Sequence, residues 1–191
     1  MKIGIFGGSF NPPHVMHKNI ALNLIKNKYL DKVIYVPTGD EYNKKGLISY
    51  NHRLNMLKLM IKNNNYIELS DIGNNTNYKY TYQVLDYYKK IYKHCDIYFI
   101  CGTDNLKEFN TWKNYKYILN KYKLLVINRN EDNIDNILMQ YKSYIDSIEV
   151  ADIHPNVLSS TYLRSNINNK KIDEYIDISV LNYIRDNNLY I

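Results

Sequence analysis

Two histidines follow a glycine pair near the start of the sequence, in the segment GGSFNPPHVMH. Glycine lets the backbone approach an anion closely, and successive N–H groups in such a turn can bind one. His14 and His17 stand three residues apart, so both imidazoles lie on one face of a helix that begins near His14. The positive end of that helix also favours negative charge. The segment therefore predicts a phosphate-binding site at which two imidazoles act on the phosphates.

The spacing of these residues excludes two common phosphate motifs. The segment is neither the G-x-x-x-x-G-K-[ST] of a P-loop nor the G-x-G-x-x-G of a dinucleotide-binding unit. Cys95 and Cys101 form neither a C-x-x-C pair nor a disulfide framework, so a reducing compartment is expected. No nucleophile–histidine triad or catalytic carboxylate pair stands out in the sequence. The expected chemistry is the positioning of a phosphate chain.

Short apolar runs alternate with longer amphipathic stretches along the whole sequence. Short apolar runs bounded by turn residues indicate strands, and apolar residues three or four apart indicate helices. Strands are predicted at residues 2–6, 33–36, 67–69, 96–100, 123–127 and 147–150. Helices are predicted at residues 15–26, 50–62, 81–92, 134–144, 161–166 and 180–187. Glycine and proline gather where the strands end, as at Gly7, Pro37 and Gly102.

This alternation predicts a fold of the α/β class. Parallel strands joined by helices form βαβ units, and right-handed crossovers arrange them as a Rossmann-like, doubly wound parallel sheet. Ligands of such sheets bind at the carboxyl ends of the strands, so the functional residues should follow the strands. The 191 residues show no internal repeat and no convincing linker, so residues 1–191 are expected to form one domain with two C-terminal helices.

Composition narrows the class of protein further. The chain is 45% hydrophobic, which is too apolar for a disordered protein, and no apolar run approaches the roughly 18 residues that cross a bilayer. No targeting signal is evident, so a cytoplasmic location without a membrane partner is expected. The net charge of +6 accompanies 21 Lys, 28 Asn and only 4 Arg, a bias typical of AT-rich coding sequences. Spread in this way, the charge does not predict a nucleic-acid partner.

Two segments resemble the signature motifs of the nucleotidylyltransferase superfamily. GGSFNPPHVMH is similar to the pattern [ST]-F-x-P-x-[HT]-x-G-H, and SSTYLR, from Ser159 to Arg164, is similar to [IV]-S-S-T-x-[IL]-R. Further blocks similar to the nicotinate mononucleotide adenylyltransferases occupy residues 52–57, 80–85, 99–106 with Phe109 and Trp112, and 124–129. The resemblance covers nearly the whole chain and implies the nucleotidylyltransferase fold.

The resemblance implies transfer of AMP from ATP to nicotinate mononucleotide, which yields deamido-NAD and pyrophosphate in NAD biosynthesis. A phosphate monoester is already anionic near neutral pH, so the protein has to align the reactants and stabilise charge. Mg²⁺ is expected as the counterion of ATP, with no direct protein ligands. ATP and nicotinate mononucleotide are the expected partners. The sequence leaves the oligomeric state open, and a homodimer is compatible with it.

Each matched position has an expected role in that reaction. His14, His17 and Arg164 are the expected catalytic residues, with Arg164 gripping the β- and γ-phosphates through its guanidinium fork. The expected ATP- and phosphate-binding residues are Gly7, Gly8, Ser9, Phe10, Lys45, Gly102, Asp104, Ser159, Ser160 and Thr161. The residues expected to bind the mononucleotide are Thr81, Trp112 and Arg129, with Trp112 stacked on the pyridine ring.

The sequence departs from the family pattern at two places. Met16 stands where the first signature has glycine, which puts the local geometry in question. The loop at residues 41–46 retains only its lysines, so either Lys44 or Lys45 could supply the second cation. Simpler structural interpretations also apply: Trp112 could be core packing, and Ser159 could be an ordinary helix N-cap.

Three alternative functions stay open at this point. The same chemistry could use nicotinamide mononucleotide, FMN or phosphopantetheine as its acceptor. The chain could bind nucleotides without turning them over, for which Met16 is the only hint. It could instead bind nucleic acid, although no recognised motif of that class supports this.

Overall fold

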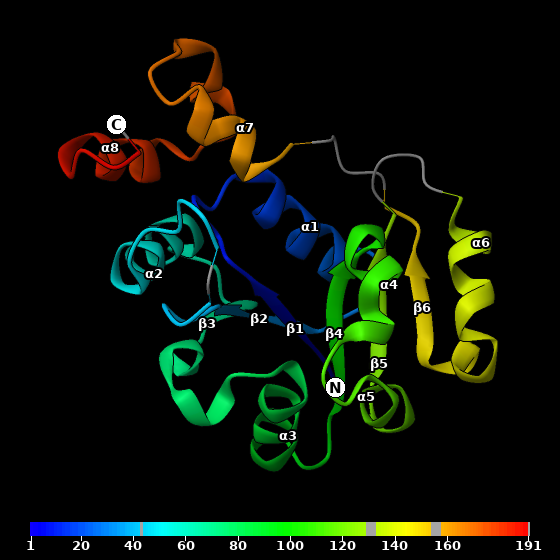
Figure 1. Cartoon of the computed structure of the whole chain (residues 1–191). Helices are drawn as coiled ribbons and strands as arrows, with labels where there is room; N and C mark the ends of the chain where they lie inside the picture. Colours follow the sequence, from blue (N-terminus) through cyan, green and yellow to red (C-terminus); the bar gives the residue numbers. More distant parts are fainter. Residues whose placement is uncertain (43, 129–132, 154–157, 191) are drawn as a thin grey trace.

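The computed structural model describes residues 1–42, 44–128, 133–153 and 158–190. Its centre is a six-stranded sheet with the strand order β3-β2-β1-β4-β5-β6, in which every pair of neighbours is parallel (Figure 1). The strands are β1 (Lys2–Gly8), β2 (Lys32–Pro37), β3 (Ile67–Leu69), β4 (Asp96–Gly102), β5 (Lys123–Ile127) and β6 (Ile148–Ala151). The order reverses between β1 and β4, so the predicted Rossmann-like, doubly wound sheet is confirmed.

Helices connect the strands and cover both faces of the sheet (Figure 1). The α-helices are α1 (Val15–Lys26), α2 (Tyr50–Ile61), α3 (Thr81–Ile91), α4 (Thr103–Glu108), α5 (Tyr115–Lys121), α6 (Ile134–Leu138), α7 (Ser160–Ser165) and α8 (Ile178–Asp186). The 3₁₀ helices are η1 (Ile72–Asn74), η2 (Thr76–Tyr78), η3 (Phe109–Thr111), η4 (Met139–Ser147) and η5 (Lys170–Tyr175). No helix in these described ranges is long and apolar enough to cross a membrane.

The two faces of the sheet carry separate hydrophobic clusters, because successive strand residues point to opposite sides. Phe6 and Tyr35 face one cluster, to which α1, α2, α7 and α8 also contribute. Ile5 and Ile34 face the other, to which α3, α4, α5 and α6 contribute. Burial on both faces explains why the strands appear in the sequence as continuous apolar runs.

The helix predicted over residues 134–144 is correct only in its first part. α6 ends at Leu138, and a 3₁₀ segment with non-helical backbone at Tyr141 follows. Tyr141 is buried, and its hydroxyl donates to the carbonyl of Leu106 over 2.7 Å and accepts from the N–H of Asn110 over 3.1 Å. These contacts hold Tyr141 against the end of α4, which is incompatible with a continuous helix.

Two short helices, α4 and α5, were not among the helices predicted from apolar periodicity. They contain 6 and 7 residues, which is too short for an apolar stripe to repeat along the helix. The remaining predicted strands and helices are present, with ends that differ by at most a few residues. α4 bears directly on the site, because it begins where β4 ends.

Candidate active site

The carboxyl ends of β1 and β4 lie side by side where the strand order reverses. Gly7 and Gly8 end β1, and Gly102 ends β4. α1 and α4 begin shortly beyond these ends, so two helix N-termini and two glycine-containing turns share one edge of the sheet. This is the edge at which doubly wound sheets bind their ligands.

A cavity of about 680 Å³ opens at this edge of the sheet. Its size lies within the range of small-molecule sites. Of the predicted functional residues, it is lined by Gly7, Gly8, Ser9, Phe10, His17, Thr81, Gly102, Asp104, Trp112 and Ser160. His14, Lys45, Ser159, Thr161 and Arg164 are not among the described residues that line it. Most of the predicted set is therefore brought together, from segments of the chain far apart in sequence.

The two histidines lie against each other at the start of α1. Their ring centroids are 3.8 Å apart, and the backbone N–H of His14 donates to Nδ1 of His17 over 3.2 Å. A backbone N–H can only donate, so Nδ1 of His17 accepts and the ring proton of the neutral imidazole is on Nε2. The His17 ring lies 4.9 Å from that of Phe10, and His14 is buried. His17 thus presents a fixed tautomer to the cavity that it lines.

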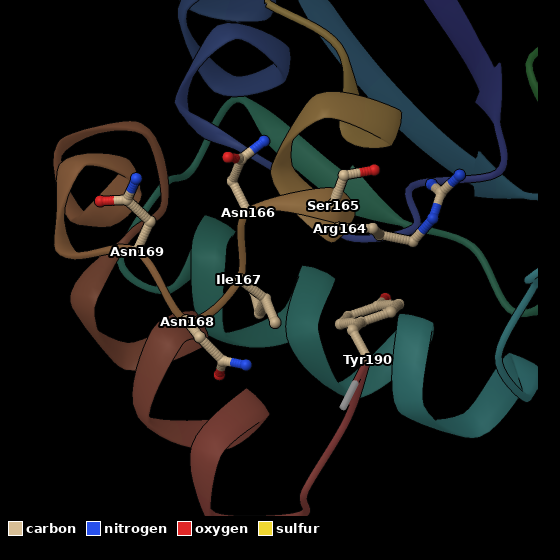
Figure 2. A pocket seen from close by; sticks show the side chains of 7 residues that line it. All are labelled: Arg164, Ser165, Asn166, Ile167, Asn168, Asn169 and Tyr190. Atoms are coloured by element: carbon tan, nitrogen blue, oxygen red, sulfur yellow. The ribbon is translucent and has the colours of Figure 1, made fainter.

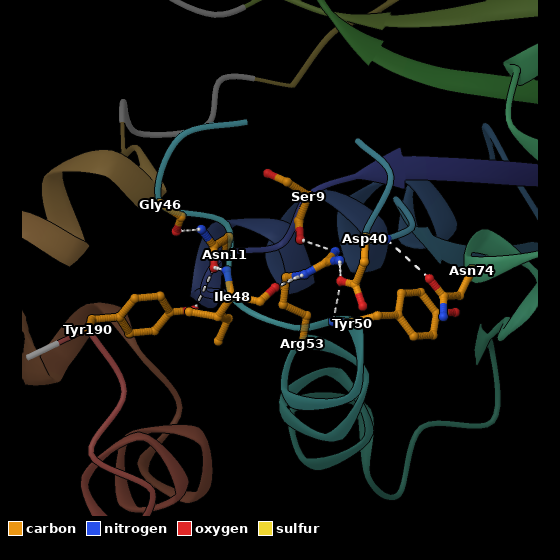
Figure 3. Close-up of polar contacts among 9 residues, drawn as sticks. All are labelled: Ser9, Asn11, Asp40, Gly46, Ile48, Tyr50, Arg53, Asn74 and Tyr190. Carbon is orange, nitrogen blue, oxygen red and sulfur yellow. Dashed lines mark hydrogen bonds and ion pairs between the residues drawn. The ribbon is translucent and has the colours of Figure 1, made fainter. Parts of the chain in front are cut away.

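Arg53 on α2 holds the turn that follows β1. Its side chain is fully buried, and its guanidinium donates to the carbonyl oxygens of Ser9 over 3.0 Å and Ile48 over 2.9 Å (Figure 3). It also forms an ion pair with Asp40 at 3.2 Å. Burial lowers the pKa of Arg53, and the hydrogen bond to Asp40 opposes that shift. The planar guanidinium can donate to all three of these acceptors at once. A lysine at this position would lack the fixed planar arrangement of donors.

Sequence reasoning assigned Arg53 no role of its own. The available signal was its rarity, because the chain has 4 Arg beside 21 Lys. Nothing local in the sequence points to a contact between Arg53 and the turn at Ser9, since the two residues are 44 positions apart.

The loop after β2 brings one lysine to the cavity. Nζ of Lys44 lies 3.4 Å from Oγ of Ser9, and Lys44 lines the cavity. The carboxylate of Asp40 anchors this loop by accepting from the N–H of Tyr50, the first residue of α2, over 2.6 Å. Of the two lysines that the sequence left open, Lys44 and not Lys45 therefore stands beside the predicted phosphate-binding turn.

The two signature motifs meet in the structure although a long stretch of chain separates them. Oγ of Ser160 donates to the carbonyl of Pro12 over 3.0 Å, across 148 positions of sequence. Nη1 of Arg164 donates to the carbonyl of Asn11 over 2.7 Å, across 153 positions. α7, which carries the second motif, is thereby bonded to the turn that forms the first.

Arg164 lines a different pocket from His17. This pocket, of about 460 Å³, is formed by Arg164, residues 165–169 and Tyr190 (Figure 2). Thr161 supports the guanidinium by accepting from Nη2 over 3.2 Å. Ser159 accepts from the N–H of Tyr162 over 3.1 Å, so it serves as the N-cap of α7, as the simpler interpretation expected. The grip of Arg164 on ATP phosphates stays a prediction.

Trp112, which follows η3, and Thr81, which begins α3, both line the cavity. Trp112 packs against the rings of Phe99 and Phe109, with centroid separations of 5.7 Å and 5.1 Å, and stays partly exposed. It is therefore both a packing residue and a lining residue. Thr81 is the first residue of α3. Arg129, the third predicted mononucleotide-binding residue, lies outside the described residues.

Acidic side chains are sparse at the cavity. Glu41, Asp104 and Glu108 are the carboxylates among its described lining residues, and Asp104 is exposed in the first turn of α4. Within the described part of the chain, no group of three or more His, Cys, Asp or Glu residues could hold a metal ion. The role of Mg²⁺ as the counterion of ATP stays a prediction. Met16 is partly exposed and is not among the described lining residues.

The sheet order and the cavity at its switch point define a nucleotidylyltransferase fold, and the cytidylyltransferase-like family model matches residues 5–166. The chain belongs to this family. It is 35% identical over 198 residues to a probable nicotinate-nucleotide adenylyltransferase of Clostridium acetobutylicum, an alignment that covers 100% of this chain and 99% of the relative. A protein of the same description from Fusobacterium nucleatum is 37% identical over 177 residues, with 90% of each chain covered.

A solved structure confirms the fold. The nicotinic acid mononucleotide adenylyltransferase of Plasmodium falciparum, complexed with NaAD, superposes with a TM-score of 0.81 over 99% of this chain and 97% of that one. The two sequences are 22% identical, so this likeness concerns the architecture. The predicted fold class and the resemblance to the nicotinate mononucleotide adenylyltransferases are both confirmed by these relatives.

Proposed function

We propose that this protein is a nicotinate-nucleotide adenylyltransferase. It transfers AMP from ATP to the phosphate of nicotinate mononucleotide, forming deamido-NAD and releasing pyrophosphate. The observation that carries the proposal is the joining of the two signature motifs, Ser160 to Pro12 and Arg164 to Asn11, beside a cavity of nucleotide size. Relatives of matching length that are described by this activity support it.

The acceptor brings its own nucleophile to this reaction. The second pKa of a phosphate monoester is about 6, so at neutral pH its oxygen can attack without a general base. A bond forms between that oxygen and the α-phosphorus of ATP, while the bond from the α-phosphorus to the bridging oxygen breaks. Pyrophosphate leaves with the electron pair. The protein contributes in-line alignment and stabilisation of the negative charge.

The residues at the turn after β1 are suited to those two tasks. His17 would donate from Nε2 to a phosphate oxygen, since its Nδ1 is occupied by the N–H of His14. Lys44 places a positive charge beside Ser9, and both line the cavity. Mg²⁺ that arrives with ATP would neutralise part of the phosphate charge, and Asp104 is suitably exposed to orient it through water.

The acceptor ring has a natural place beside Trp112. The indole lines the cavity and is held by Phe99 and Phe109, so it offers a fixed aromatic surface for stacking. Thr81 is the first residue of α3, where its hydroxyl and the positive end of the helix dipole favour a carboxylate. That preference for negative charge favours the nicotinate acceptor over the nicotinamide one.

The proposal is tested by measuring pyrophosphate release from ATP and Mg²⁺ with each mononucleotide. We expect kcat/KM for nicotinate mononucleotide to exceed that for nicotinamide mononucleotide, FMN and phosphopantetheine. His17→Ala should lower kcat by about 10² to 10³ because it removes a donor to the transition state. The control is His94→Ala, which removes an exposed imidazole outside the cavity and should leave kcat unchanged. Circular dichroism checks that both variants fold.

The outcomes separate the alternatives. Absence of pyrophosphate release with every acceptor, together with tight ATP binding, would identify a non-catalytic nucleotide binder. A reversed preference would assign the amide acceptor. Tight, salt-dependent binding to single- or double-stranded nucleic acid in place of nucleotide turnover would identify a nucleic-acid binder.

The pH profile gives a second test of the nucleophile. Protonation of the acceptor phosphate below about pH 6 removes the dianion, so kcat/KM for the mononucleotide should fall as the pH drops through that value. The profile is obtained from initial rates at saturating ATP between pH 5 and 8. A flat profile would contradict attack by the unassisted phosphate.

A further inference from the structure

Asn11 is the junction at which four separate segments of the chain meet. Its side chain is buried, and its Nδ2 donates to the carbonyl of Gly46 over 2.8 Å (Figure 3). Its Oδ1 accepts from the hydroxyl of Tyr190 over 2.9 Å and from the N–H of Ile48 over 3.4 Å. Its backbone carbonyl accepts from Arg164 over 2.7 Å. The turn after β1 is thus joined through one residue to the loop before α2, to α7 and to the end of the chain.

The strongest partner of the Asn11 side-chain oxygen is Tyr190, since the contact from Ile48 is long. Tyr190 stands after α8, where the buried Leu189 anchors the tail in the hydrophobic cluster that α2 shares. Its ring also forms one wall of the pocket that Arg164 lines (Figure 2). The hydroxyl therefore reaches the turn from a point 179 positions away in sequence.

Tyr190 and Phe10, the residue before Asn11, both lie in strained parts of the backbone. Tyr190 has φ of 67° and Phe10, beside Asn11, has φ of 46°, in the left-handed region that bulky residues seldom occupy. Such conformations persist only where surrounding contacts hold them, and they concentrate at functional sites. Burial raises the pKa of the Tyr190 hydroxyl, with the nearby Arg164 and Arg53 acting in the opposite direction. The hydroxyl consequently stays protonated and able to donate throughout the neutral range.

We propose that Tyr190 is a positioning residue for adenylyl transfer. Its hydroxyl holds the side chain of Asn11 in place. Asn11 in turn fixes the turn that carries Ser9 and Phe10, and its own backbone carbonyl holds the guanidinium of Arg164. This inference rests on the proposed function. Tyr190 is not among the described residues that line the cavity of His17, so its effect on the turn after β1 passes through Asn11. A small displacement of the phosphate-binding turn is costly, because in-line attack requires close alignment of the reacting atoms.

Tyr190→Phe tests this role because it removes the hydroxyl and keeps the ring. We expect kcat for pyrophosphate release to fall about tenfold, while KM for nicotinate mononucleotide changes by less than about twofold. The matched control is Tyr183→Phe on α8, whose hydroxyl contacts Nδ1 of His52 at 3.0 Å and Nδ2 of Asn55 at 3.2 Å instead of the turn. Tyr183→Phe should keep the wild-type kcat.

Two further measurements separate positioning from general stability. Amide hydrogen exchange in the segment 8–14, whose amides exclude Pro12 and Pro13, should be faster in Tyr190→Phe than in the wild type and unchanged in Tyr183→Phe. In an Asn11→Ala background, Tyr190→Phe should lower kcat no further, because the two residues act as one unit. Wild-type exchange at residues 8–14 in Tyr190→Phe, equal losses of kcat in both tyrosine variants, or multiplicative losses in the double variant would overturn the proposal.

The same experiment distinguishes this inference from the proposed function. A wild-type protein that releases no pyrophosphate overturns the adenylyltransferase assignment, and the exchange comparison then still reports whether Tyr190 orders the turn. A fully active wild type with an equally active Tyr190→Phe variant overturns the role of Tyr190 alone.

Discussion

Two polar clusters on opposite faces of the sheet differ in burial and in what they bind. Arg53, under the turn after β1, is fully buried and donates to the main-chain carbonyls of Ser9 and Ile48. Asp86 on α3 is partly exposed and accepts from two side chains of α5, Lys121 at 2.7 Å and Tyr117 at 2.8 Å. The first cluster holds backbone at the site, whereas the second joins two helices at the surface.

Burial, and not the number of contacts, separates the two clusters. Partial burial acts to raise the pKa of Asp86, but hydrogen bonds from Lys121, Tyr122 and Tyr117 outweigh it and hold that pKa below its ordinary value. Water still screens this cluster, so each pair contributes little. The carbonyls bound by Arg53 are shielded from water, and losing their donor leaves them unsatisfied. We therefore expect the site to depend on Arg53 and to be insensitive to Asp86.

The largest effect is expected for Arg53→Met. The variant removes three hydrogen-bonding interactions from a buried position, so the free energy of unfolding should fall by about 2 to 4 kcal/mol. Urea denaturation monitored by circular dichroism measures this. Arg53→Lys, which keeps the charge but not the planar fork, should recover only part of the loss. Full recovery by lysine would show that charge, and not the geometry of the guanidinium, holds the turn.

A smaller effect is expected for Asp86→Asn. Because the pKa of Asp86 is lower in the folded protein, its stabilisation is present above its ordinary pKa and is lost as the pH falls through the folded value. The variant should therefore be less stable than the wild type by about 1 kcal/mol or less at pH 7, and the difference should shrink below about pH 4. Urea titrations at both pH values test this. A lower kcat in this variant would contradict the expectation that the site is insensitive to Asp86.

The smallest effect is expected for Arg185→Gln. Arg185 also pairs with a carboxylate, Asp173, at 3.1 Å, but its side chain is 52% exposed. The free energy of unfolding should change by about 0.5 kcal/mol or less. This variant is the control for Arg53→Met, since both remove a paired arginine. A loss comparable to that of Arg53→Met would show that burial does not separate the two arginines.

Much of the fold and part of the site could be predicted from local patterns. The helix at residues 15–26 and the strands at 67–69 and 123–127 were predicted with their observed ends. The segment that continues α6 was not, because Tyr141 is drawn to Leu106 by a contact that periodicity does not encode. At the site, the glycine turn and His17 line one cavity, as expected of a shared phosphate site, while Arg164 lines a separate pocket.

Local patterns are enough to predict the sheet, most of the helices that cover it and the two signature motifs, since apolar periodicity and turn chemistry act over a few neighbouring residues. Three contacts emerge only in the folded molecule: Lys44 and not Lys45 stands beside Ser9, Arg53 donates to the carbonyl of Ser9, and Tyr190 donates to Asn11. Those contacts join positions 35, 44 and 179 residues apart. These contacts form only once the sheet has brought the segments together, so no local sequence pattern could predict them.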